Sequence, residues 1–312
     1  LTQLVEKINF DYWVICDTGS TDSTPDIIKQ FFTNINIPGE LLHHSWKDFS
    51  HNRNLALNAA FNKTDYLLVF DADDEIIGNI DIPKFMDLDS YFLEFGGECS
   101  YKREAIVNNR KKWKYVGVLH EILKSCEPVG PPGHITGNYH LISGRTGSRN
   151  NDPDKYKKDA EVLVKAYNEA GPEVELWLKQ RYAFYCANSF RDAKMWDKAI
   201  EWYKLRITLG GWVQELYISH KYIGDILFNM PPEEGVDKKD TAVQHWLRAC
   251  EYNANRYETL ASAAKYFISK NQDFLAKLLY DQVNIDYLVT DPNCLFMDIR
   301  LHNYGLLCDM IM

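Results

Sequence analysis

Short apolar runs separated by amphipathic stretches fill the first 145 residues of the chain, and long amphipathic stretches fill most of the remainder. Runs of strand length predict strands at residues 13–16, 40–45, 66–70, 91–95, 104–107 and 116–123. Apolar residues at helical spacing predict helices at residues 25–32 and 50–61. Alternating strands and helices are typical of an α/β fold with a mostly parallel sheet.

Two segments of this first part carry turn and loop signals instead. Residues 126–137 contain three prolines and three glycines, which predicts a loop. Residues 143–153 are polar and contain glycine, which favours either an active-site lid or a linker between domains.

From Lys155 onward the pattern predicts long helices and an internal repeat. A small residue stands four places before an aromatic one in the pairs Ala199 and Tyr203, Ala242 and Trp246, and Ala276 and Tyr280. The last two alanines are 34 residues apart, which equals the tetratricopeptide period. The sequence therefore predicts helical hairpins, which bury their apolar faces only by stacking.

The tryptophans of this helical part divide into two groups. Helical spacing predicts core packing for Trp177, Trp196, Trp202 and Trp246. Trp212 follows two glycines suited to a helix terminus, so we expect it near a groove between repeats. Stacked hairpins form concave surfaces that suit a peptide, a glycan chain or a second copy of the chain, which would make a homo-oligomer.

Composition narrows the class of protein. The 312 residues carry a formal charge of −9, which excludes the basic face that nucleic-acid binding needs. The sequence has no apolar run of transmembrane length and no signal-peptide pattern, although it begins at Leu1 rather than Met. Its seven cysteines are scattered and form no Cys-x-x-Cys pair, so we expect reduced thiols and an intracellular, cytoplasmic location.

Candidate chemistry begins where the apolar run 67–70 ends in carboxylates. Asp71 and Asp73 stand two places apart, so their oxygens can share a divalent cation. Upstream, the predicted strand 13–16 ends in Asp17, Thr18 and Gly19. In open α/β sheets, ligands bind beyond the carboxyl ends of the strands, which is where both segments fall.

These two segments, together with residues 46–54 and 115–121, resemble family-2 glycosyltransferases of the GT-A fold. Order and spacing are similar to the branch of that family in which tetratricopeptide-like helices follow the catalytic domain. The resemblance implies a GT-A domain at residues 1–145, lacking its usual first strand, and a helical domain at residues 155–312. It also implies a metal-dependent, inverting transfer of a sugar from a nucleoside-diphosphate donor, with UDP favoured, to a glycan or protein acceptor.

The resemblance assigns a metal site to the acidic segment. It implies that Asp73 binds Mn²⁺ or Mg²⁺ directly and that Asp71 contacts the ribose or the water shell of the metal. His140 is the candidate third ligand, with His134 as its competitor. Asp74 and Glu75 are expected to have supporting roles.

The same resemblance assigns the nucleotide contacts to Asp17, Thr18, Gly19 and Arg53. Many relatives carry a second Asp where this chain has Thr18, so the base preference stays open. Ser20 and Asp22 fit better as caps of the helix that follows them.

For catalysis, the resemblance points to Glu121 as the general base and to His120 as a donor contact. If residues 116–123 form one strand, these two side chains point to opposite faces. A purely structural role for the pair remains open, with Asp152 or Asp154 as the next candidate bases. Arg103 and Trp113 are candidates for the acceptor side.

Two other classes of protein compete with this interpretation. A haloacid-dehalogenase-type phosphatase also has an Asp-x-Asp after an apolar strand, but it needs Ser or Thr two places after the second Asp. This chain has Glu75 there. The second competitor is a catalytically inactive scaffold that binds a partner through its helical repeats, which the intact acidic motif disfavours.

Overall fold

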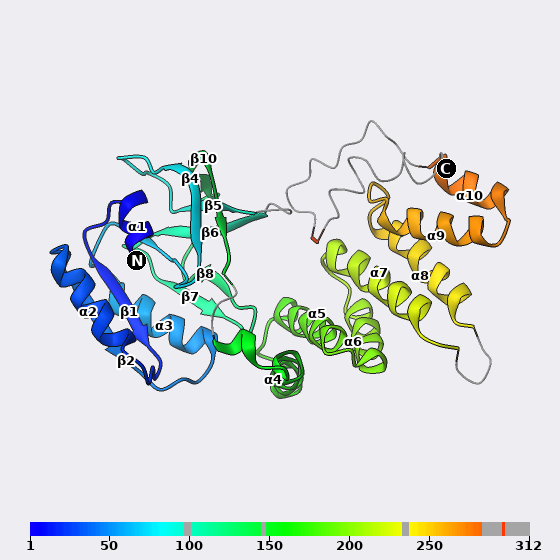
Figure 1. Cartoon of the computed structure of the whole chain (residues 1–312), viewed down its shortest axis with the longest axis horizontal. Coiled ribbons are helices and arrows are strands. Elements are labelled where there is room, and N and C mark those ends of the chain that lie inside the picture. The colour runs from blue at the N-terminus through cyan, green and yellow to red at the C-terminus, as the bar shows by residue number, and fades with distance from the viewer. Residues whose placement is uncertain (97–100, 145–147, 233–236, 283–294, 297–312) are drawn as a thin grey trace. The chain divides into compact units, whose positions relative to one another are not determined.

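The computed structural model describes residues 1–96, 101–144, 148–232, 237–282 and 295–296. The chain divides into two units, Leu1–Asp152 and Pro153–Met312 (Figure 1). The first unit holds the strands and the second is helical, so each is treated by itself. Among the described helices, none is both long enough and apolar enough to cross a membrane.

The first unit begins with a short helix, α1 (Thr2–Lys7), and then a β-α-β element. Strands β1 (Trp13–Asp17) and β2 (Gly39–His43) pair in parallel, and α2 (Thr24–Asn34) connects them. The ring of Trp13 stacks on that of Phe32 with centroids 4.2 Å apart, which packs α2 against β1. These three elements match the predicted ones to within two residues, whereas α1 was not predicted.

A six-stranded sheet forms the rest of the core of this unit. Its order is β3-β6-β5-β10-β4, with β9 beside β5. The strands are β3 (Tyr66–Leu68), β4 (Glu75–Asp81), β5 (Ser90–Phe95), β6 (Tyr101–Asn108), β9 (Gly133–His134) and β10 (Thr136–Ile142). Alternate residues of the central strands, such as Leu93, Phe95 and Leu141, are fully buried.

The sheet is mixed, and its antiparallel pairings outnumber its parallel ones, which corrects the expectation of a mostly parallel sheet. β10 runs parallel to β5 but antiparallel to β4, and β6 is antiparallel to both of its neighbours. The apolar pattern located several of the strands but carried no information on their direction. The segment 126–137, predicted as a loop, contains β9 and the start of β10.

The predicted strand 116–123 is instead a hairpin. β7 (Trp113–Val116) pairs antiparallel with β8 (Ile122–Ser125), and Val116 lies opposite Ile122. Gly117 and His120 have φ angles of 109° and 53°, so both lie in the left-handed region within the connecting turn. The helix α3 (Phe49–Ala60) precedes this hairpin in the chain and packs against β7.

The second unit is a succession of helices in which each packs on the next (Figure 1). They are α4 (Lys155–Glu169), α5 (Leu176–Asp192), α6 (Trp196–Thr208), α7 (Val213–Asn229), α8 (Lys239–Tyr252), α9 (Glu258–Ser269) and α10 (Asp273–Tyr280). Ala199, Ala242 and Ala276 are all buried, at corresponding places in α6, α8 and α10. The arrangement is consistent with helical-hairpin repeats.

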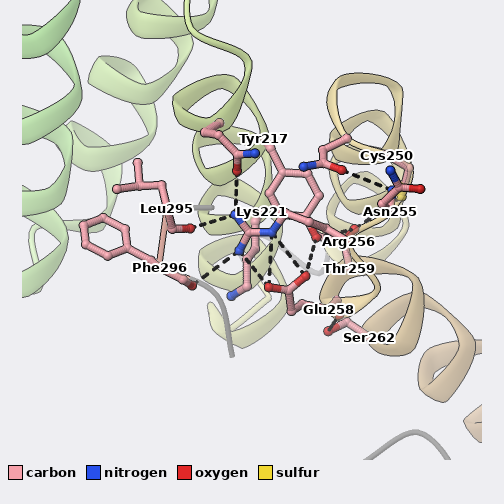
Figure 2. A network of polar contacts seen from close by, with 12 residues as sticks. Tyr217, Lys221, Cys250, Asn255, Arg256, Glu258, Thr259, Ser262, Leu295 and Phe296 are labelled. Carbon is pink, nitrogen blue, oxygen red and sulfur yellow. Dashed lines mark hydrogen bonds and ion pairs between the residues drawn. The ribbon is translucent and has the colours of Figure 1, made fainter. Parts of the chain in front are cut away.

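A buried arginine connects two helices of this unit, α7 and α9 (Figure 2). Arg256 forms an ion pair with Glu258, with Nη2 2.7 Å from Oε1, and its guanidinium lies over the ring of Tyr217 in α7. Arg256 also donates hydrogen bonds to Gln214 and to the carbonyl oxygen of Leu295. A charge without access to water is stable only when it is paired in this way.

Candidate active site

Polar side chains at the start of α3 fasten two neighbouring segments. Asp48 caps the helix, accepting a hydrogen bond from the backbone N–H of His51 at 2.7 Å. Asn52 donates to the carbonyl of Ser45 and accepts from the N–H of Lys47, so it holds the segment between β2 and α3. Asp48 and Asn52 of the segment 46–54 thus stabilise the local backbone, in addition to any contact with a ligand.

The same helix holds the β7–β8 hairpin. Asn54 accepts a hydrogen bond from the N–H of Tyr115 at 2.7 Å and donates to the carbonyl of Tyr115 at 3.0 Å. Ser50 donates to the carbonyl of Gly117, at the start of the turn. These contacts position the turn, and Glu121 after it, along the side of α3 that carries Arg53.

Arg53 is the centre of the candidate site. Its Nη2 lies 2.6 Å from Oδ1 of Asp71, and its Nε lies 2.7 Å from Oε1 of Glu121. The guanidinium also lies 5.2 Å from the centroid of the Tyr115 ring. One arginine therefore brings together the acidic motif after β3 and the His-Glu pair after the hairpin turn, which are 50 residues apart in sequence.

Electrostatics keep this arginine charged. Burial lowers the pKa of Arg53, but the carboxylates of Asp71 and Glu121 and the Tyr115 hydroxyl outweigh that effect and raise it. Burial raises the pKa of Tyr115 to about 12, so its hydroxyl is protonated at neutral pH. The centre of the site is thus a cation held between two carboxylates.

A second arginine completes the cluster from β6. Nη1 of Arg103 lies 3.2 Å from Oδ2 of Asp71, and its Nη2 lies 3.1 Å from Oδ2 of Asp74. The Arg103 guanidinium stacks over Phe95 of β5, 4.2 Å from the ring centroid. Burial and then the charge of Asp71 raise the pKa of Asp74. Asp74 is therefore a buried member of the cluster that is paired with Arg103.

The residues of the acidic segment fit a hard divalent cation by their chemistry, since Asp71 and Asp73 offer carboxylate oxygens. Both oxygens of Asp71 face arginines, whereas the carboxylate of Asp73 has no partner among the described residues. No group of three or more His, Cys, Asp or Glu side chains suited to a metal occurs in the described part of the chain. Asp73 is therefore the side chain most open to an added ion.

His140 and His134 lie on strands instead of at this loop. His140 is in β10 opposite Ile77 of β4, and Ile142, two places further, lies opposite Glu75. The residue beside Asp73 is Gly144, where an added Cβ would overlap the Asp73 carbonyl oxygen. His134 is in β9, with its ring stacked on Phe92. The contacts of this structure thus lend His140 no support as a ligand, and its assignment stays a prediction.

The turn after β1 is organised by Asp17. Its buried carboxylate accepts hydrogen bonds from the N–H groups of Gly19 and Ser20 and lies 3.3 Å from Nδ1 of His43. The Ser20 hydroxyl bond lowers the pKa of Asp17 most, with backbone and His43 hydrogen bonds adding to it and burial opposing it. Gly19 has open space where a Cβ would stand and a φ of 109°. Gly19 and the half-buried Thr18 are thus more accessible to a nucleotide than Asp17 is.

Three further predictions concerned the cap of α2, the orientation of His120 and Glu121, and the role of Trp113. Asp22 accepts a hydrogen bond from the N–H of Thr24, the first residue of α2, but the N-cap position is Ser23, so neither Ser20 nor Asp22 is the N-cap that was predicted. Because residues 117–121 form a turn, the argument that His120 and Glu121 point to opposite faces of a strand is wrong. Trp113 is buried and donates to the carbonyl of Asn108, so it is a core residue.

Sequence reasoning gave too little weight to Arg103 and overlooked Tyr115. Arg103 was placed only on the acceptor side, since the partner strand that brings it to Asp71 could not be inferred from the local pattern. Tyr115 belongs to the segment 115–121 that carried the resemblance. The Tyr115 ring packs against the guanidinium of Arg53, so Tyr115 is part of the candidate site.

Comparison with protein families agrees with this geometry. A sequence model described as Glycosyl transferase family 2 matches residues 3–89. The match includes β1, α3 and the acidic segment, and it ends before Arg103 and Glu121. A search of curated proteins finds no significant match. The family match supports a family-2 glycosyltransferase, and dependence on a nucleotide sugar is a general property of that family.

Proposed function

We propose that this chain is a metal-dependent, inverting glycosyltransferase that moves a sugar from a nucleoside-diphosphate donor, with UDP favoured, to a glycan or protein acceptor. The catalytic domain would be residues 1–145 and the TPR-like domain residues 155–312. The observation that carries this proposal is the double ion pair of Arg53 with Asp71 and Glu121. It joins the metal motif, a phosphate-binding group and a candidate base at one point.

The donor end of the site would use the acidic segment and the turn after β1. Asp73 and Asp71 would hold Mn²⁺ or Mg²⁺, with His140 as the candidate third ligand. When bound, the ion would neutralise charge on the departing diphosphate. Thr18 and Gly19 would contact the nucleoside, with Asp17 shaping their turn through the two N–H groups that it accepts. The hydroxyl of Thr18 leaves the choice of base open.

The acceptor end would use Glu121. In a single displacement, an acceptor oxygen attacks the anomeric carbon while the bond from that carbon to the diphosphate oxygen breaks. The acceptor proton passes to the carboxylate of Glu121, and the nucleoside diphosphate leaves with the bonding electron pair. His120, in the left-handed turn before Glu121, would contact the donor.

Arg53 would connect the two ends. Without donor, its guanidinium holds Oε1 of Glu121 at 2.7 Å, so that oxygen is already engaged. A diphosphate carries more charge than a carboxylate and offers the geometry that an arginine prefers. Donor binding would therefore draw Arg53 toward the phosphates and release Glu121 for the acceptor.

The contacts disfavour the phosphatase alternative. A phosphate-transfer nucleophile needs one oxygen free for attack, but both oxygens of Asp71 are engaged by Arg53 and Arg103. The place two residues after Asp73 is Glu75, which begins β4 and supplies no hydroxyl.

The first test is Asp73→Asn, which should abolish sugar transfer and metal-dependent nucleotide binding while leaving the fold intact. Hydrolysis of a panel of UDP-sugars is measured with Mn²⁺, with Mg²⁺ and with EDTA, and UDP binding is followed by thermal shift. Asp81→Asn, at the exposed far end of β4, is the matched control and should behave as wild type. Unchanged metal dependence in Asp73→Asn would remove the metal assignment.

A further inference from the structure

A cavity of about 430 Å³ lies in the helical unit, formed by the end of α5, the start of α6 and the last turns of α7. Its size falls within the range of small-molecule sites. The lining includes the aromatic residues Trp196 and Tyr222 and the charged residues Arg191, Asp192, Lys194 and Asp225. None of these residues belongs to the candidate active site.

Local backbone structure fixes the position of Trp196. The α5–α6 turn closes through bonds from the N–H of Lys194 to Arg191 and from the N–H of Met195 to Phe190, with Lys194 at a φ of 59°. Trp196 follows as the first residue of α6 and is 39% exposed, although its helical spacing predicted core packing. A flat apolar surface is therefore held at the edge of the cavity.

Several charged side chains of the cavity are held in place by contacts with neighbouring residues. Arg191 stacks over the ring of Tyr222 at 3.9 Å and binds Oδ1 of Asp192 through both Nε and Nη2. Asp225 is fixed by Lys221 at 2.6 Å and by the indole N–H of Trp246 at 2.9 Å. These side chains are positioned before any ligand arrives, which lowers the entropic cost of binding.

Several hydrogen-bonding atoms of the cavity remain available. Within the described part of the chain, Oδ2 of Asp192, Nζ of Lys194 and Oδ1 of Asn229 have no partner. Two anionic and two cationic side chains line the cavity, so neither a strongly anionic nor a cationic ligand is favoured. The site suits a neutral molecule with hydroxyl groups on its rim and an apolar face, which describes a sugar ring.

We propose that this cavity binds a neutral saccharide. Sugar hydroxyls would donate to Asp192 and Asn229 and accept from Lys194, and the C–H face of the ring would lie on Trp196. The binding site itself needs no catalytic activity. Its assignment as the place where a glycan acceptor is held rests on the proposed glycosyltransferase function.

The test is direct binding of lactose, maltose and cellobiose to the full chain, measured by saturation-transfer NMR and by titration calorimetry without nucleotide or metal. Wild type should bind at least one of them at millimolar concentration. Trp196→Ala and Asp192→Asn should each weaken that binding at least tenfold. Tyr156→Ala is the matched control, because Tyr156 of α4 is similarly exposed, at 41%, but does not line the cavity.

The outcomes separate this proposal from the proposed function. Saccharide binding that is lost in Trp196→Ala and retained in Tyr156→Ala supports the site, even if hydrolysis of UDP-sugars is never detected. Absence of binding to wild type, or equal binding by wild type and Trp196→Ala, overturns the site and leaves the donor assignments as they stand. Circular dichroism and the thermal midpoint show whether Asp192→Asn is folded, and Trp196→Ala provides the second variant.

Discussion

Arginine–carboxylate pairs occur in both units of this protein, but their burial differs sharply. Arg53 is 27% exposed, and its partners Asp71 and Glu121 are 25% and 11% exposed. In the helical unit, Arg206 and Arg256 are fully buried, and their partners Glu215 and Glu258 are 5% and 2% exposed. A pair that reaches solvent can be opened by a competing anion, whereas a buried pair must stay closed for the fold to persist.

The difference indicates two uses of the same chemistry. Around Arg53, the charges come from four separate segments, namely α3, the end of β3, β6 and the hairpin turn, so a ligand can rearrange them without unfolding any element. Around Arg206, the N–H groups bind Glu215 and the carbonyl of Gly210, which close the α6–α7 turn. The first cluster is suited to catalysis and the second to structure.

The strongest test of the comparison removes a charge from the solvent-accessible cluster around Arg53. Glu121→Gln keeps the shape of the side chain but removes the proton acceptor, so turnover should fall by a factor on the order of 10²–10⁴. The KM for the donor should change little. Glu94→Gln is the control and should retain full turnover, because among the described residues the only ion pair of Glu94 is a 3.9 Å contact with Lys102. Near-normal transfer by Glu121→Gln would move the base to another residue, with Asp152 and Asp154 examined next.

Removing the arginine of a fully buried pair should lower the unfolding free energy more than removing Arg53 does. Arg256→Met leaves Glu258 buried without its cation and should lower the unfolding free energy by about 3–5 kcal/mol. Arg53→Met should cost only about 1 kcal/mol, since its partners can be hydrated. Urea unfolding followed by tryptophan fluorescence compares the two variants. Equal losses of unfolding free energy would contradict the distinction between the solvent-accessible cluster around Arg53 and the buried cluster around Arg256.

An effect on stability that depends on pH is expected from a pair of histidines, one buried and one half-buried. His220 in α7 and His245 in α8 face each other with their Nδ1 atoms 3.0 Å apart. Burial lowers the pKa of each from 6.5 to about 4, with His245 and Arg248 adding to the effect on His220, and Lys204 and Arg248 to that on His245. The unfolded chain therefore binds more protons than the folded chain between pH 6.5 and 4.

The stabilisation from this pair is complete above pH 6.5 and is lost as the pH falls toward 4. For a single histidine it amounts to about 3 kcal/mol. Thermal midpoints between pH 7.5 and 4.5 should fall less steeply in His220→Gln/His245→Gln than in wild type. Parallel curves for the two proteins would show that the pair does not contribute to acid sensitivity.

Sequence patterns predicted most of the first unit because its strands are buried on at least one face. The elements 13–16 and 91–95 were located to within one residue. β4 was missed because it is at the edge of its sheet, where most of its side chains are exposed and the apolar pattern is weak. The β7–β8 hairpin was missed because its turn lacks an Asn-Gly or Asp-Gly signal.

For the candidate site, the sequence placed Arg53 and Asp71 in one crevice, since both follow from the order of elements in an α/β fold. The contribution of Arg103 depends on which strand pairs with β3, and strand pairing is a long-range property. The same limit applies to Trp196, whose helical spacing gave no sign that a turn would expose it.

Gly144 carries a consequence for natural variation and for engineering. It packs so closely on the backbone of Asp73 that any side chain would displace the acidic segment. The residue at position 144 therefore limits, by steric contact, the conformation of a segment that lies 71 residues earlier in the sequence. Natural variants with a larger residue there should carry compensating changes around Asp73. In directed evolution, a deliberate substitution at position 144 offers a way to alter the acidic segment without replacing a single one of its carboxylates.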